Sequence, residues 1–236
     1  MISLVSSSSD ERCTVDSVRW LAVPARRIPA PAVALLVRHG RTPTTGTVLP
    51  GRAPGLHLSD DGKAQAEAAA QRIATLKKPP VAVYASPLER AMETAKPIAA
   101  RLGLRVRVER GLLECDFGAW TGAKLATLRR RREWRSVESF PSSFRFPDGE
   151  SFVEMQARMV STLDRLADRH RGKTFVAVSH ADPIKAAVAS TAGIPLDLFQ
   201  RLVVSPCSIT ALVRGESGSY VLSVNVTPSL SELALS

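Results

Sequence analysis

Residues 32–40 of this chain read AVALLVRHG, an unbroken apolar run that ends in an arginine, a histidine and a glycine. An unbroken run is typical of a strand buried on both faces of a sheet, because a half-exposed strand alternates apolar and polar residues. Two further runs have the same character, VAVYA at residues 81–85 and TFVAVS at residues 174–179. The three runs therefore predict buried strands of one parallel sheet.

Helix patterns alternate with these strands. Residues 59–76 are rich in alanine and have a polar face, which predicts a crossover helix between the first two strands. Residues 86–89 (SPLE) place a serine cap, a proline at the first helical position and a glutamate at the third, so a helix is expected there. The pair Ser151 and Glu154 is a second capping box, opening a helix that runs to about residue 171. Residues 181–192 predict a further helix after the third strand.

The chain closes on two more strand patterns, ITALV at residues 209–213 and YVLSVNV at residues 220–226, joined by a glycine-containing turn. Strands that alternate with helices predict an α/β fold of three layers, α/β/α, with a mainly parallel sheet and helices on both faces. Residues 1–31 contain a serine run and three prolines, which predict a loosely attached N-terminal extension. We expect one domain over residues 32–228 and a C-terminal tail over residues 229–236.

The charge balance indicates an anionic partner. The chain of 236 residues carries 32 Lys and Arg against 22 Asp and Glu, a formal net charge of +10. Such a balance suits nucleic acid, an acidic membrane surface or a phosphorylated small molecule. Aromatic residues make up only 5% of the chain, and no zinc-finger or RNP-like pattern occurs, which argues against nucleic acid.

The cysteines, the apolar runs and the N-terminal residues indicate the cellular compartment of the protein and its relation to membranes. Cys13, Cys115 and Cys207 are too few and too scattered for a disulfide framework or a metal cluster, so reduced thiols are expected. No apolar run approaches the roughly 18 residues of a membrane span. Acidic Asp10 and Glu11 stand where a secretory signal would be basic and then apolar. The sequence thus predicts a cytoplasmic location without membrane contact.

The candidate site lies where three predicted strands end. Arg38 and His39 follow the first strand, Arg90 lies one turn into the helix after the second, and His180 follows the third. Ligands of open α/β sheets bind at the carboxyl ends of the strands, where loops and helix N-termini converge. A single arginine in a first helical turn usually caps or is solvated, and a single histidine at a strand end is more often structural. Four such residues on one rim favour a binding site.

The residue types indicate phosphoryl chemistry. Two guanidiniums and helix amides suit the oxygens of a phosphoryl group, and a neutral imidazole such as that of His39 can attack phosphorus. The arginines favour the neutral imidazole because they penalise a third positive charge, and Gly40 allows the backbone to approach an anion closely. Paired histidines also bind metals, but cationic neighbours repel a metal ion and no carboxylate accompanies them. We expect no metal and no other cofactor.

A leaving alkoxide needs a proton, so an acid is expected near the same rim. Glu114 is the first candidate, in the glycine-containing stretch LLECDFGAWTG at residues 112–122, which predicts an anchored loop. Asp116 lies two residues further on and remains an alternative. A surface carboxylate without a catalytic role is the other explanation for Glu114.

These residues resemble a known family, the histidine phosphatase superfamily, which includes cofactor-dependent phosphoglycerate mutases, fructose bisphosphatases and broad-specificity acid phosphatases. The resemblance extends from about residue 32 to residue 226 and rests on six motifs in order, of which RHG alone would be weak. They are LLVRHGRT (35–42), LSDDGKAQA (58–66), YASPLERAMETA (84–95), LLECDFGAWTG (112–122), FPDGES (146–151) and VSHADPIK (178–185).

The resemblance implies a role for each matching residue. His39 would be the phosphorylated nucleophile, and Glu114 rather than Asp116 the proton donor and later the base for water. Thr42 matches a position whose hydroxyl lies near the phosphate. Apart from the resemblance, Arg52 and His57 lie on the loop after RHG, where Arg52 could touch a substrate, although a surface arginine is the more ordinary explanation. The expected catalytic set is His39, Glu114, His180, Arg38 and Arg90. The expected substrate-binding set is Arg38, Gly40, Thr42, Arg52, Arg90, His180 and Ala181.

The chain also departs from the family pattern. Arg41 stands where many members have Glu, Gln or Ser, and Thr45 stands where many have Asn. These departures affect one contact on the phosphate side. Ala181 replaces the usual glycine after the second histidine. Thr121 stands where mutases commonly carry glutamate, which favours hydrolysis.

The sequence predicts a phosphomonoesterase of the acid phosphatase type that acts on a small phosphorylated metabolite through a phosphohistidine. The alternative is a phosphomutase, which must hold a second anionic group. The run Arg129 to Arg132 offers cations for this purpose, but on a helix at most one or two of them would face a pocket, and a solvated basic face is the more ordinary explanation. A catalytically silent phosphate-binding or scaffold protein is the alternative of another class. A homo-oligomer, a dimer or larger, is compatible with the sequence.

Overall fold

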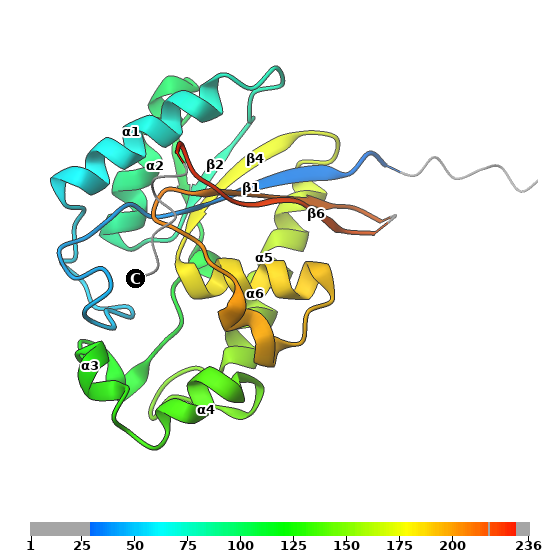
Figure 1. Cartoon of the computed structure of the whole chain (residues 1–236). Helices are drawn as coiled ribbons and strands as arrows, with labels where there is room; N and C mark the ends of the chain where they lie inside the picture. Colours follow the sequence, from blue (N-terminus) through cyan, green and yellow to red (C-terminus); the bar gives the residue numbers. More distant parts are fainter. Residues whose placement is uncertain (1–28, 217, 230–236) are drawn as a thin grey trace, which may run out of the picture.

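Six strands form one mixed sheet in the computed structural model, which describes residues 29–216 and 218–229 (Figure 1). The strand order is β3-β2-β4-β1-β5-β6. Strands β1 to β4 are parallel, β5 is antiparallel to β1, and β6 is antiparallel to β5, so the predicted mainly parallel sheet is confirmed. The strands are β1 (Ala32–Arg38), β2 (Val83–Ala85), β3 (Val106–Val108), β4 (Thr174–Ser179), β5 (Ile209–Arg214) and β6 (Tyr220–Val226).

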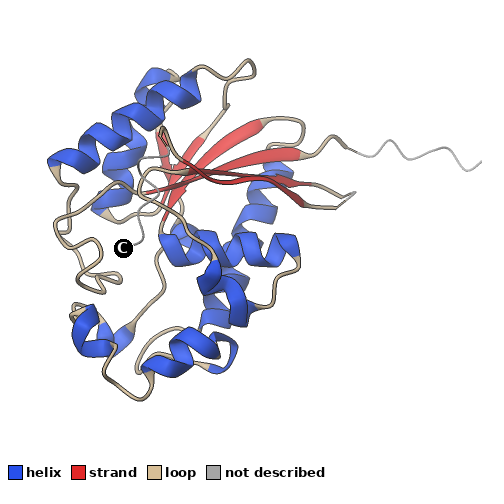
Figure 2. Ribbon diagram, viewed as in Figure 1, coloured by secondary structure: helices blue, strands red, loops and turns tan. Residues whose placement is uncertain are grey.

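Helices cover both faces of the sheet and complete the predicted three layers (Figure 2). Helices α1 (Asp60–Ala74) and α2 (Glu89–Arg101) cover one face. Helices α5 (Phe152–Arg169) and α6 (Ala181–Ala192) cover the other. The short helices are α3 (Leu125–Leu128), α4 (Trp134–Ser139) and the 3₁₀ helices η1 (Arg110–Leu112), η2 (Gly118–Trp120), η3 (Pro141–Ser143) and η4 (Leu196–Arg201).

Strand β1 is apolar throughout because it supplies side chains to both layers. Ala34 and Leu36 belong to the core under α5 and α6, whereas Leu35 and Val37 belong to the core under α1 and α2. Leu36 and Val37 are fully buried. The unbroken apolar run thus marks a strand buried on both sides, as predicted.

One of the two predicted capping boxes is confirmed and the other is wrong. Ser151 Oγ accepts from the Glu154 backbone N–H (3.2 Å) while Glu154 Oε2 accepts from the Ser151 N–H (3.0 Å), and α5 then runs to Arg169, two residues short of the predicted end. Helix α2 instead begins at Glu89, with Leu88 as its N-cap and no side-chain cap. The Ser86 hydroxyl instead accepts a long hydrogen bond from the Leu88 N–H (3.5 Å) and lies 2.9 Å from Nε2 of His180, the residue after β4.

A long segment between β3 and α5, residues 110–151, consists of short helices and loops, and we call it the insertion. The stretch around Trp120 is an anchored loop with two 3₁₀ turns, as predicted, and Trp120 is buried edge-on against Phe146, with ring centroids 5.5 Å apart. Residues 129–132 form the turn between α3 and α4, so the expectation that four arginines lie on one helix is wrong. Strand β3, at the sheet edge, is an element that the sequence did not predict.

Several sequence predictions fall partly outside the described residues. The N-terminal extension over 1–31 and the tail over 229–236 lie mostly there, as does Cys13, so the domain boundaries and the redox state of the thiols stay predictions. Cys115 and Cys207 are buried. Within the described ranges, no helix combines the length and the apolar character needed to cross a lipid bilayer.

Candidate active site

Three adjacent strands, β2, β4 and β1, end at the same edge of the sheet and bring the predicted basic residues together. Arg38 is the last residue of β1 and His39 follows it, His180 directly follows β4, and Arg90 is the second residue of α2. The rings of His39 and His180 have centroids 5.1 Å apart. His39, His180 and Arg90 are buried, and Arg38 is partly buried. We refer to Arg38, His39, Arg90 and His180 as the basic cluster.

The hydrogen bonding of His39 leaves one ring nitrogen with a lone pair. Nδ1 lies 2.8 Å from the carbonyl oxygen of Gly40. Because a carbonyl oxygen can only accept, Nδ1 carries the hydrogen and Nε2 of the neutral ring is unprotonated. Burial, followed by the charges of Arg38 and Arg90, lowers the pKa of His39 well below its ordinary value of 6.5. His39 therefore has the protonation state of a nucleophile.

His180 is oriented by a hydroxyl group from the neighbouring strand end. Its Nε2 lies 2.9 Å from Ser86 Oγ, one residue after β2. Its Nδ1 is buried and has no hydrogen-bond partner among the described residues. Burial, followed by Arg90 and His39, lowers the pKa of His180 well below 6.5. When the serine hydroxyl donates to Nε2, Nδ1 carries the hydrogen and can donate it to an anion.

Backbone carbonyls hold the two arginines in place. Arg38 Nη1 donates to the Val204 carbonyl (2.7 Å), and Arg90 Nη2 donates to the Gly51 carbonyl (2.8 Å). Within the described ranges, Arg38 Nε and both Arg90 Nε and Nη1 are buried without a hydrogen-bond partner. Because an unmade hydrogen bond is unfavourable in a buried site, these donors indicate that the cluster is built for an anion.

Glu114 shares the electrostatic environment of the basic cluster. Its side chain is buried, and Oε1 accepts from the Cys115 backbone N–H (2.9 Å). Burial, and then the negative charge of Asp182, raise the pKa of Glu114 from 4.5 to about 7, although Arg90 and Arg38 act in the opposite direction. A carboxyl group with this pKa holds a proton near neutral pH, which is the requirement for a general acid.

Asp116, the alternative acid, is engaged in holding the loop. Its Oδ1 accepts from the Gly118 backbone N–H (3.1 Å) and its Oδ2 pairs with Arg52 Nη1 (3.3 Å). Its side chain is 40% exposed, unlike that of Glu114. The geometry therefore favours Glu114 as the acid.

Arg52 lies in a network of carboxylates instead of reaching the basic cluster. Its Nη2 pairs with Glu150 Oε2 (2.8 Å), and its Nε donates to the Glu114 carbonyl oxygen (2.8 Å). Together with the pair to Asp116, these bonds use all three guanidinium nitrogens. Three of the five N–H groups of Arg52 are thus bonded within the protein, and the one on Nε holds the backbone that carries Glu114.

Gly40 is required by helix packing. A Cβ atom at Gly40 would lie 2.5 Å from the carbonyl oxygen of Gly62 in the first turn of α1. The Gly40 N–H donates to Thr94 Oγ1 (3.0 Å), and its carbonyl accepts from His39. Its two backbone polar groups are therefore used inside the protein, and close packing against α1 by itself requires a glycine at this position.

Two further predicted binding residues lie at the rim of the site. Thr42 is buried, and its Oγ1 lies 3.0 Å from Thr45 Oγ1, which also accepts from the Thr42 N–H (2.9 Å). Thr45, a departure from the family pattern, thus stabilises the turn after RHG. Ala181 is the first residue of α6, next to His180 at the N-cap.

Sequence reasoning missed three polar residues near the cluster. Ser86 was interpreted as a helix cap and instead orients His180. Asp182, in the first turn of α6, acts electrostatically on both Glu114 and Arg38, and its position two residues after His180 was the available clue.

Ser208 is the third missed residue. It is almost fully buried, and its Oγ has no hydrogen-bond partner within the described ranges. The adjacent Cys207 N–H donates to the Arg38 carbonyl (3.0 Å), which holds this segment at the end of β1. No local pattern in the sequence links residue 208 to residue 38.

Comparisons with known proteins agree with this geometry. The histidine phosphatase superfamily (branch 1) matches residues 34–227. An uncharacterized protein of Mycobacterium tuberculosis is 40% identical over 153 residues, which are 63% of this chain and 73% of that protein. Phosphoserine phosphatase 1 of Hydrogenobacter thermophilus is 30% identical over 203 residues, which are 84% of this chain and 94% of that protein.

Solved structures give the same result. A mycobacterial glucosyl-3-phosphoglycerate phosphatase has a TM-score of 0.74 at 25% identity, over 84% of this chain and all of that chain. A phosphoserine phosphatase mutant of Entamoeba histolytica in complex with phosphoserine has a TM-score of 0.75 at 26% identity, over 84% of this chain and 99% of that chain. The site, the matched length and the fold together show that this chain belongs to the histidine phosphatase superfamily (branch 1).

Proposed function

We propose that the protein is a phosphomonoesterase that hydrolyses a small phosphorylated metabolite through a phosphohistidine at His39. The observation that carries this proposal is the basic cluster itself, in which buried arginine and histidine nitrogens without partners in the described structure surround one unprotonated imidazole nitrogen. A simple anion-binding protein has no need of a buried acid such as Glu114 beside the cluster.

The proposed reaction has two balanced steps. In the first, His39 Nε2 attacks phosphorus, the P–O bond to the alcohol breaks, and Glu114 gives its proton to the departing oxygen. In the second, water attacks the phosphorus, Glu114 takes a proton from that water, and the N–P bond breaks to release phosphate. The nitrogens of Arg38, Arg90 and His180 stabilise the charge on the phosphoryl oxygens in both transition states.

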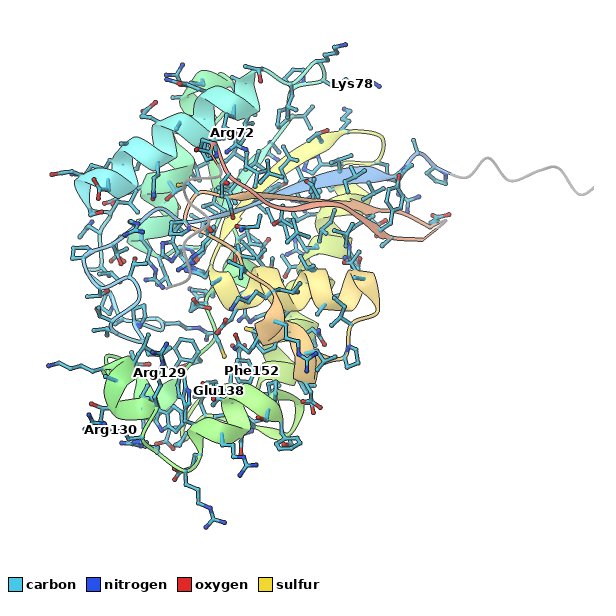
Figure 3. All side chains as sticks on the ribbon, in the orientation of Figure 1. Arg72, Lys78, Arg129, Arg130, Glu138 and Phe152 are labelled. Atoms are coloured by element: carbon cyan, nitrogen blue, oxygen red, sulfur yellow. The ribbon has the colours of Figure 1, made fainter. Side chains whose placement is uncertain are left out.

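Two observations favour hydrolysis over phosphomutase activity. The relatives include proteins named phosphoserine phosphatase and glucosyl-3-phosphoglycerate phosphatase. Of the arginines 129–132, Arg130 lies at the outer edge of the molecule, away from the strand ends (Figure 3). A mutase would need several cations to hold a second anionic group while it excludes water.

Trapping of the intermediate tests the proposal. The purified protein is mixed with a ³²P-labelled phosphomonoester and quenched in base, in which phosphohistidine survives. We expect label on His39, free phosphate as the product, and neither in the His39→Ala variant. Retained turnover by His39→Ala, or the recovery of an isomerised ester instead of phosphate, would contradict covalent hydrolysis.

A further inference from the structure

A cavity of about 470 Å³ lies between the insertion and the first turn of α6, the helix that has His180 as its N-cap. We call it the α6 cavity. Figure 3 shows three of its labelled residues, Arg129, Glu138 and Phe152, close together below α6. Its lining consists of Leu49, Phe117, Leu125, Arg129, Trp134, Val137, Glu138, Phe146, Phe152, Asp182, Lys185 and Gln200.

The α6 cavity adjoins the place where the alcohol of a substrate must leave. Asp182, in its wall, is two residues from His180 and acts on the charge of Glu114. Phe117, another wall residue, lies close to Gly51, where a Cβ atom would lie 3.3 Å from the Phe117 ring and 2.8 Å from Thr121 Oγ1. The Gly51 carbonyl anchors Arg90. Two wall residues of the cavity, Asp182 and Phe117, thus lie close to His180 and to the backbone that anchors Arg90.

The lining is mainly apolar and is held rigidly. Seven of its twelve side chains are apolar. The Trp134 ring stacks on Trp120 at 6.2 Å and donates from Nε1 to Glu138 Oε1 (2.7 Å). Phe146 packs against both Phe117 (4.9 Å) and Phe152 (5.2 Å). Walls of this kind are suited to the flat faces of a ring.

The formal charges of the lining cancel. The wall includes two cations, Arg129 and Lys185, and two carboxylates, Glu138 and Asp182. Lys185 is occupied within the wall, since its Nζ donates to Gln200 Oε1 (3.0 Å) and lies 3.7 Å from Asp182 Oδ1. A cavity without net charge gives no advantage to an alcohol that carries its own carboxylate.

The volume excludes a close fit to a very small alcohol. An apolar cavity of roughly 150 Å³ accepts benzene, so this one has room for about two rings. Serine or glycerate would leave most of the apolar wall in contact with water.

From these observations we propose that the α6 cavity binds the alcohol part of the substrate, and that this part is an uncharged group of one or two rings. The inference rests on the proposed phosphatase function and adds the substrate class. It separates the protein from its relatives named for phosphoserine, whose alcohol is small and charged.

Three esters with similar alkoxide leaving groups test the inference in the wild-type protein. They are propyl phosphate, phosphoserine and 2-(2-naphthyl)ethyl phosphate. Because burial of a ring adds about 1.5–3 kcal/mol of favourable transfer, kcat/KM for the naphthyl ester should exceed that for propyl phosphate about ten- to hundredfold. Phosphoserine should not exceed propyl phosphate.

A substitution in the wall locates the effect. Leu125→Arg puts a charge among the apolar side chains and should reduce the naphthyl preference about tenfold or more, while propyl phosphate is affected far less. Arg130→Ala, in the same insertion but outside the cavity, is the matched control and should keep the wild-type preference. Should Leu125→Arg fail to fold, Leu125→Gln at the same partly exposed position gives the same comparison.

The outcomes separate the two proposals. Equal kcat/KM for the three esters, a preference for phosphoserine, or an equal loss for both uncharged esters in the Leu125 variants would overturn the substrate class and leave the phosphatase function standing. No turnover of any ester would overturn both.

Discussion

His180 Nε2 lies 2.9 Å from Ser86 Oγ, a contact between the ends of two adjacent parallel strands. Since both groups are buried, this bond fixes which nitrogen of His180 is directed to a phosphoryl group. Ser86 is therefore a positioning residue for His180.

Ser86→Ala should lower kcat/KM about two- to tenfold, because a net hydrogen bond of about 0.5–1.5 kcal/mol that orients His180 is lost. Steady-state kinetics should place the loss mainly in kcat. Ser86→Thr keeps the hydroxyl and should recover most of the activity, which a purely structural role would not require. Wild-type kinetics in Ser86→Ala would refute the positioning role.

The pH dependence should depend on the leaving group. Glu114, with its pKa near 7, must be protonated to release an alkoxide, so kcat/KM for an alkyl phosphate should fall as pH rises above about 7. A nitrophenolate leaves without a proton, and p-nitrophenyl phosphate should show a weaker fall. Profiles from pH 5 to 9 for both esters provide the measurement. Identical profiles that climb to pH 9 would rule out Glu114 as the acid.

The same carboxyl group should affect stability in a pH-dependent way. Its folded-state pKa is raised from 4.5 to about 7, so its contribution to stability is fully present below pH 4.5 and is lost as pH rises through 7. Gln does not ionise, so Glu114→Gln should gain stability relative to the wild type above pH 7, by up to about 3 kcal/mol. Urea unfolding at pH 5 and pH 8 measures the difference. A constant difference at both values would contradict the raised pKa.

The sequence predicts those strands whose burial determines their own residue pattern. Strands β1 and β4 are buried on both faces and therefore read as unbroken apolar runs, and their bounds followed within a residue. Strand β3, by contrast, has three residues at the sheet edge and is largely exposed, so it carries no apolar run. The unbroken apolar run therefore indicates burial on both faces and not strand formation itself.

The site was predictable to the extent that it lies at strand ends. His39, Arg38, Arg90 and His180 were found because parallel strands end together. Ser86 was misassigned because SPLE fits a helix start locally, whereas its actual partner is 94 residues away in sequence. A short pattern cannot distinguish a cap from a bond across the sheet, since both use the same hydroxyl.

Metal removal should have no effect on the rate. Arg38 and Arg90 place positive charge beside both histidines, which opposes the binding of a cation there. Excess chelator should leave kcat for an aryl phosphate unchanged. The measurement compares kcat before and after the protein is dialysed against the chelator. A loss that a divalent cation restores would show that the cluster works in another way.

Substitution of Arg52 distinguishes a structural role of this residue from a role in binding the substrate. Its guanidinium pairs with Glu150 at 2.8 Å and with Asp116 at 3.3 Å, and it donates to the Glu114 carbonyl, so removal leaves a partly buried acidic network with less charge compensation. Arg52→Ala should therefore lower the free energy of unfolding by about 1–3 kcal/mol.

A substrate ligand would behave differently, because its loss raises KM without a comparable loss of stability. We expect kcat rather than KM to change in Arg52→Ala, since the loop that carries Glu114 loosens. Arg165→Ala, which removes a partly exposed ion pair to Glu109 just before the insertion, is the control and should have little effect on either. A large rise in KM with wild-type stability would show instead that Arg52 binds the substrate.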